Sequence, residues 1–86
     1  KRQVNLMDLA IFYLDNKDYD KAFVLFDEIY NLDKSYHLAQ LYKGYGLALK
    51  GDSRAAKNII FKLPIELIAE KIEFVNDIFS MSDNSE

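Results

Sequence analysis

The spacing of apolar residues along the chain has the period of an α-helix. Apolar positions recur three and four residues apart, and no stretch alternates between apolar and polar as a half-buried strand would. Only one proline and three glycines interrupt the pattern. The sequence therefore predicts an all-α fold of about five antiparallel helices, with residues 1–80 as a single domain. The expected helices span about 4–15, 18–32, 35–50, 53–62 and 65–79, and we expect 81–86 to be a disordered polar tail.

Five residues predict where these helices begin and end. Asp18, Ser35 and Ser53 belong to the types that cap helix N-termini. Gly51 suits the left-handed stop that follows the third helix. Pro64 ends the fourth helix and is expected in the first turn of the fifth.

Two stretches that lie 34 residues apart share the same order of small residues and turn residues. Ala22 and Ala56 each follow a turn-like run, and twelve residues before them stand Ala10 and Gly44. A period of this length corresponds to one helical hairpin, which cannot bury its apolar face without a neighbour. We therefore interpret the chain as two helical hairpins plus a C-terminal helix, and we expect it to act by binding rather than by catalysis.

At these positions the chain resembles the tetratricopeptide repeat. The first copy of the family's pattern is matched by Leu6, Leu9, Ala10, Tyr13, Ala22 and Phe26. The weaker second copy keeps Gly44, Leu47, Ala56, Ile60 and Leu63. Gln40 and Lys43 stand where the first copy has Leu6 and Leu9. The resemblance covers about residues 4–63 and implies stacked antiparallel hairpins.

In this family the first helix of each hairpin lines a concave groove. The corresponding positions here are nearly all apolar: Val4, Met7, Ile11, Leu14, Leu38, Leu41, Tyr42, Tyr45 and Leu49. Such a lining suits an amphipathic helix of a partner protein. We expect a charge at Leu41 or Tyr45 to abolish capture of that helix without unfolding the chain. The alternative is that the last helix folds back over this stripe, which would make these residues core.

The last predicted helix carries apolar residues on two sides. One stripe consists of Ile65, Ile68, Ile72, Val75 and Phe79, and the second of Leu67, Phe74 and Ile78. One core contact needs a single stripe. Either this helix is packed between other helices on both sides, or one stripe is free to bind a partner chain.

The short acidic chain, its apolar groove and the runs at 42–51 and 72–76 also resemble the small needle-subunit chaperones of bacterial type III secretion. This resemblance implies a cytoplasmic bacterial protein that holds the amphipathic helix of a needle subunit and prevents its premature polymerisation. It also implies a hetero-oligomer, with a small co-chaperone on the outside. The alternative is a generic scaffold or adaptor module, or a fragment of a longer repeat protein.

Composition and isolated polar residues exclude several other functions. The net charge of −3 and the scattered Lys and Arg argue against a nucleic-acid partner. No apolar run approaches the roughly 18 residues of a membrane span, and there is no cysteine. His37 has no nucleophile at an arguable spacing, and the acidic cluster at 15–20 lacks the glycine and distal glutamate of a calcium loop. We expect no enzymatic activity, no metal and no cofactor.

Overall fold

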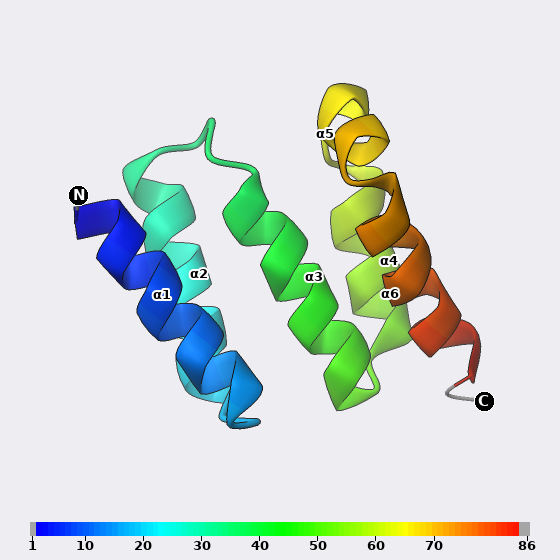
Figure 1. The fold of residues 1–86 in the computed structure, drawn as a ribbon, viewed down its shortest axis with the longest axis horizontal. Helices are drawn as coiled ribbons and strands as arrows, with labels where there is room; N and C mark the ends of the chain where they lie inside the picture. Colours follow the sequence, from blue (N-terminus) through cyan, green and yellow to red (C-terminus); the bar gives the residue numbers. More distant parts are fainter. Residues whose placement is uncertain (1, 85–86) are drawn as a thin grey trace.

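The computed structural model describes residues 2–84, with the side chains of residues 6–81. Within this part of the chain the ordered elements are all helices, which confirms the all-α expectation. They are α1 (Arg2–Asp15), α2 (Tyr19–Leu32), α3 (Leu38–Lys50), α4 (Ser53–Phe61), α5 (Ile65–Glu70) and α6 (Ile72–Asn84). Figure 1 shows α1–α2 and α3–α4 as antiparallel hairpins placed side by side, with α6 beyond them.

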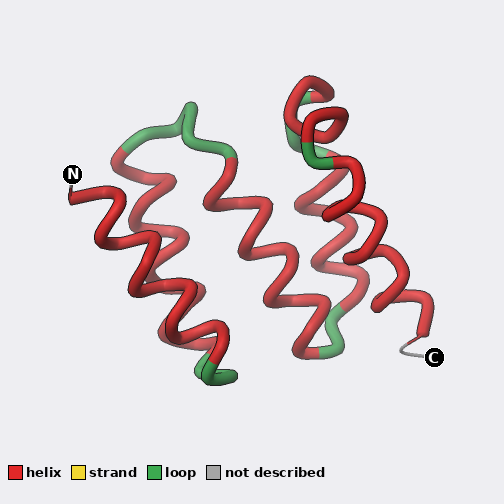
Figure 2. Tube along the Cα trace, in the orientation of Figure 1, coloured by secondary structure: helices red, strands yellow, loops and turns green. Residues whose placement is uncertain are grey.

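The helices stack in chain order. Helix α2 packs on α1 and on α3, and α4 packs on α3. Helix α6 then lies against both α3 and α4. The connections between them are short and lie at the ends of the helices (Figure 2), so the broad faces of the molecule are formed by helices.

The 34-residue period of the sequence is also the period of the structure. Helices α2 and α4 begin at Tyr19 and Ser53, which are 34 residues apart. Helices α3 and α6 begin at Leu38 and Ile72, which have the same separation. Helix α6 therefore takes the place that a first helix of a third hairpin would have.

The turns of the two hairpins are equivalent as well. Lys17 and Gly51, again 34 residues apart, both have left-handed backbone angles, with φ of 63° and 100°. In each turn the next residue, Asp18 or Asp52, donates its backbone N–H five residues back, and both N–H···O distances are 2.8 Å. This is the left-handed cap that ends many helices. It was expected at Gly51 but not at Lys17, because lysine seldom adopts this conformation.

Two predicted N-caps differ in detail. Asp52, not Ser53, caps α4, and its Oδ1 accepts the Ala55 N–H at 3.3 Å. Asp18 is the N-cap residue of α2, as expected, but its side chain makes no capping hydrogen bond. It lies 3.6 Å from the Lys21 ammonium instead.

The third helix begins at Leu38 rather than at Ser35. The Ser35 hydroxyl and N–H both donate to Oδ1 of Asp33, at 2.6 and 3.0 Å, so Ser35 belongs to a turn and caps nothing. These two bonds favour the ionised carboxylate, the hydroxyl bond most, and they hold the pKa of Asp33 below its ordinary value of 3.8.

The expected single helix over 65–79 is broken. Lys71 leaves the helical region, with φ of −109° and ψ of 32°, and separates α5 from α6. The break lets the Val75 and Ile78 side chains of α6 reach the core, while α5 stays at the end of the α3–α4 hairpin. Helix α6 continues to Asn84, so the tail expected from residue 81 is helical over 81–84. Residues 85–86 lie outside the described part.

Two apolar clusters hold the stack together. The first joins α1, α2 and the start of α3 around the fully buried Phe26 and Ile29. The second joins α3, α4 and α6 around Leu41, Ile60 and Ile78. The half-buried side chains that pack between these centres, Tyr45 among them, make the core continuous along the stack.

Candidate functional site

The nine residues expected to line a concave groove have unequal exposure. Met7, Leu14 and Leu41 are buried in the core. Half-buried positions are Ile11, Leu38, Tyr42 and Tyr45. Leu49 is exposed, and the side chain of Val4 lies outside the described residues. The structure brings the described members of α1 and the middle of α3 into one packed region, but not as an open groove.

Helix α6 covers the middle of the expected groove lining on α3. We call this lining the α3 stripe, and it comprises Leu38, Leu41, Tyr42, Tyr45 and Leu49. The Phe74 ring centroid lies 5.3 Å from that of Tyr42 and 5.1 Å from that of Tyr45. Leu41 is 0% exposed and shares its cluster with Val75 and Ile78. The expectation that Leu41 faces a partner is therefore wrong, and the back-folded C-terminal helix is the arrangement that the structure has.

The second stripe of the C-terminal segment is no substitute for that groove. Ile78 is fully buried, and Phe74 is engaged with the two tyrosines of α3. Leu67 is half-buried against the same cluster. The second stripe is thus packed inside the molecule, whereas Ile65 and Ile72 of the first stripe are 74% and 45% exposed.

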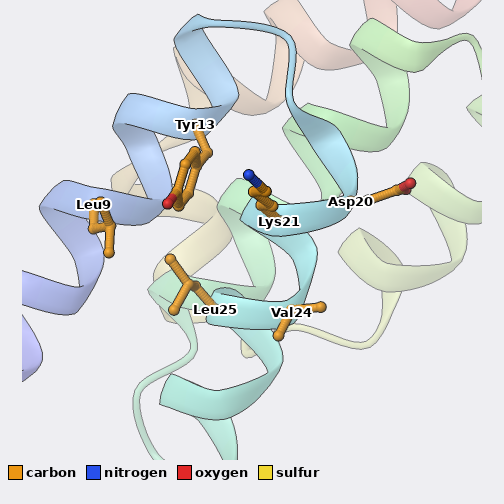
Figure 3. Close-up of a pocket in the computed structure, with 6 residues that line it drawn as sticks. All are labelled: Leu9, Tyr13, Asp20, Lys21, Val24 and Leu25. Carbon is orange, nitrogen blue, oxygen red and sulfur yellow. The ribbon is translucent and has the colours of Figure 1, made fainter.

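The open apolar surface lies instead on the first hairpin. Leu9, Phe12 and Val24 are 42%, 58% and 64% exposed. Between α1 and α2 runs a groove of about 350 Å³, which we call the α1–α2 groove. It is lined by Leu9, Tyr13, Asp20, Lys21, Val24 and Leu25. Figure 3 shows Leu9 and Tyr13 facing Leu25 across this groove, with Lys21 beside the tyrosine and Asp20 pointing away.

Charge lies only at one end of this groove. Lys21 Nζ is 5.5 Å from the centre of the Tyr13 ring and 3.6 Å from Oδ2 of Asp18. The ammonium is thus engaged with a ring face and a carboxylate at the end near the turn. Apart from Asp20, which points away from the groove (Figure 3), the remaining lining consists of Leu9, Tyr13, Val24 and Leu25, which suits a helix or extended segment with an apolar stripe.

The groove follows from how α1 and α2 pack. Ala10 and Ala22 are completely buried between the two helices, and their small side chains let the backbones approach closely. The larger residues Leu9 and Leu25 then lie on opposite sides of the α1–α2 groove on the outer surface.

Sequence reasoning missed this surface, although a signal was present in the internal repeat. Val24 corresponds to Asn58, and Leu9 corresponds to Lys43. Polar residues of the second hairpin are thus replaced by apolar ones in the first. A comparison of the two copies by polarity would have marked Leu9 and Val24, although it would also have marked Phe61, which stands where the first hairpin has Asp27.

A second group of exposed apolar residues lies at the other end of the stack. Phe61 and Ile65 are 70% and 74% exposed, and the Phe61 ring lies 5.9 Å from that of Phe79. The described pockets do not include these residues. The α1–α2 groove is therefore the better-shaped site for a ligand.

The polar residues form no comparable constellation. Among residues whose side chains are described, no three His, Asp or Glu lie close enough together to hold a metal ion. His37 stands at the start of α3 with its ring 6.0 Å from that of Tyr30. No helix in the described part of the chain is long and apolar enough to cross a membrane.

Comparison of the chain with known protein families, with curated proteins and with solved structures finds no match. The geometry of the α1–α2 groove therefore carries the functional inference.

Proposed function

We propose that this chain is a protein-binding chaperone that holds an amphipathic helix of a partner protein. It has no catalytic role, metal or cofactor in this proposal. The binding surface is the α1–α2 groove together with the exposed apolar side chains beside it, and not the α3 stripe that the repeat pattern favours.

One observation carries this proposal. The first hairpin exposes Leu9, Phe12 and Val24 next to a groove with a mostly apolar lining. Other apolar residues of the same two helices are buried in the core, so these three are not needed to form it. Contiguous apolar patches on a small protein are typical of interaction surfaces. A groove between two helices accepts a third helix through anchors spaced three and four residues apart.

The resemblance to needle-subunit chaperones supports a more specific version. In it the bound helix belongs to a type III secretion needle subunit, the complex is a hetero-oligomer with a co-chaperone, and its compartment is the bacterial cytoplasm. A general repeat scaffold is the second candidate, since a neighbouring repeat would cover the same exposed face of α1.

The test is co-expression with a candidate needle subunit, followed by capture of the complex. Val24→Lys places a charge beside the groove and should reduce capture at least about tenfold, because the lysine would have to be desolvated against apolar anchors. Leu32→Lys is the matched control. Leu32 is on the same helix, is also 64% exposed and does not line the groove, so its capture should stay at the wild-type level.

Circular dichroism of both variants checks that the helices persist. Equal capture by the Val24 and Leu32 variants would rule out the α1–α2 groove as the binding surface. Failure of the wild-type chain to capture any needle subunit would reject the type III version.

A further inference from the structure

Helix α2 shows how a helix docks on the first helix of a hairpin. It lies on α3, where Asp27 pairs with Lys43 at 2.8 Å and the Phe26 ring stacks on Tyr42 with centroids 6.3 Å apart. One turn further along α3, a Cβ added to Gly46 would lie 2.8 Å from the Phe23 ring. Positions 42, 43 and 46 of α3 thus form the surface that receives α2.

The 34-residue period places an equivalent surface on α1. Tyr42, Lys43 and Gly46 correspond to Asp8, Leu9 and Phe12. All three of these α1 residues are exposed, and we call them the α1 outer face. Leu9 also lines the α1–α2 groove, so the face and the groove form one surface. The equivalent face of α3 is covered by a helix, whereas no helix of the described chain covers the α1 outer face.

We infer that the α1 outer face receives an amphipathic α-helix of a partner protein, docked as α2 docks on α3. This inference rests on the proposed function and adds the register and chemistry of the bound helix. The partner helix takes the direction that α2 has relative to α3, and it contacts α1 through residues at positions i, i+3 and i+4. These are the positions held by Phe23, Phe26 and Asp27 in α2.

The differences between the two surfaces define the partner's residues. Phe12 replaces Gly46, so the facing position i must be small, since a second large ring would not fit. Asp8 replaces Tyr42, so position i+3 should carry Lys or Arg. Leu9 replaces Lys43, so position i+4 should be apolar, because an aspartate there would be desolvated without a partner. The predicted motif is small, basic and apolar at i, i+3 and i+4.

Two synthetic helices derived from α2 test this register. Both are fluorescently labelled peptides of residues 19–32 with Phe23→Ala and Phe26→Lys, stapled on the opposite side to hold the helix. The first also carries Asp27→Leu, and the second retains Asp27. Fluorescence anisotropy measures their affinities for the full chain and for its Leu9→Lys variant, which restores on α1 the residue present at position 43.

We expect the wild-type chain to prefer the leucine peptide by at least about tenfold, and the Leu9→Lys variant to prefer the aspartate peptide. Phe61→Lys, at the other end of the stack, is the control and should keep the wild-type preference. Nonspecific hydrophobic binding or partial unfolding would change the affinities of the two peptides alike. Neither can therefore reverse which peptide binds more tightly.

An identical peptide preference in wild type and Leu9→Lys, or no binding of either peptide, would overturn the inference. So would a dimer in sedimentation that Leu9→Lys dissociates, since a second copy would then be the occupant. Reversal without capture of any needle subunit supports the docking register and rejects the type III partner. Capture without a reversal supports the proposed function and rejects this register.

Discussion

At the scale of single residues, the two glycines inside α3 have different surroundings. A Cβ on Gly44 would lie 3.5 Å from Ile60 Cγ1, which is an ordinary contact. A Cβ on Gly46 would lie 2.8 Å from both Leu14 Cδ1 and Phe23 Cε1, closer than side chains tolerate. The same substitution should therefore have opposite effects at the two positions.

We predict that Gly44→Ala raises the free energy of unfolding by about 0.5 to 1 kcal/mol, because alanine is the better helix former. Gly46→Ala gains the same propensity but has to displace two packed side chains, so it should be less stable than Gly44→Ala by about 1 to 3 kcal/mol. Urea denaturation of both variants measures the difference. Equal stabilities would show that α1 and α2 yield easily around Gly46.

Gln40 is a second residue with a local conflict. Its Oε1 is buried and accepts no hydrogen bond from the described residues. It stands where the first hairpin has Leu6. We predict that Gln40→Leu stabilises the chain by about 1 kcal/mol by removing an unsatisfied acceptor. Thermal denaturation tests this, with Gln40→Met as the control of similar shape. A loss of stability in both variants would mean that the amide is needed where it is.

At the scale of elements, the two equivalent turns differ in one residue. Lys17 and Gly51 both adopt left-handed angles, but only glycine does so without a steric penalty. We predict that Lys17→Gly raises the free energy of unfolding by up to about 1 kcal/mol and that Gly51→Ala lowers it by about 1 kcal/mol. Denaturant titration measures both. Destabilisation by Lys17→Gly would contradict strain at this turn.

The C-terminal segment shows how an element is divided by packing. A straight helix over 65–79 would direct its two apolar stripes to different sides. With the break at Lys71, α6 turns Val75 and Ile78 into the α3–α4 hairpin. Ile65 at the start of α5 remains 74% exposed. The break thus buries Val75 and Ile78 of α6 but leaves Ile65 of α5 in contact with solvent.

At the scale of the whole molecule, the covering of α3 by α6 decides which surface is free. Leu41 is 0% exposed and Leu49 is 40% exposed on the same helix. We predict that Leu41→Glu costs more than about 3 kcal/mol, because a carboxylate would be buried without a partner. The total stability of a domain of this size is about 4 to 13 kcal/mol. This variant should therefore lose much of its helical circular dichroism at moderate temperature.

Leu49→Glu is the matched control and should keep the helical signal and the thermal transition of the parent. A Leu41 variant that folds like the parent would show that α6 does not cover α3 in solution. It would also restore the α3 stripe as a candidate binding surface.

Helical periodicity depends on residues three and four positions apart, and the 34-residue repeat is visible in the sequence itself, so the sequence alone determined both. Gly51 and Pro64 marked helix ends because their backbone restrictions act within one or two residues. The pairing of Ala10 with Ala22 likewise needed only the two antiparallel helices of one hairpin.

Tertiary structure decided which apolar stripe is core and which is surface. Leu41 and Leu9 are both apolar residues on first helices of hairpins, and no local rule separates them. Leu41 is buried because α6 packs beside α3, whereas Leu9 is exposed because no described helix lies on α1 in the way that α2 lies on α3 at the equivalent Lys43. Burial depends on contacts between segments distant in the chain, so a local pattern can predict an amphipathic helix but not what covers its apolar face.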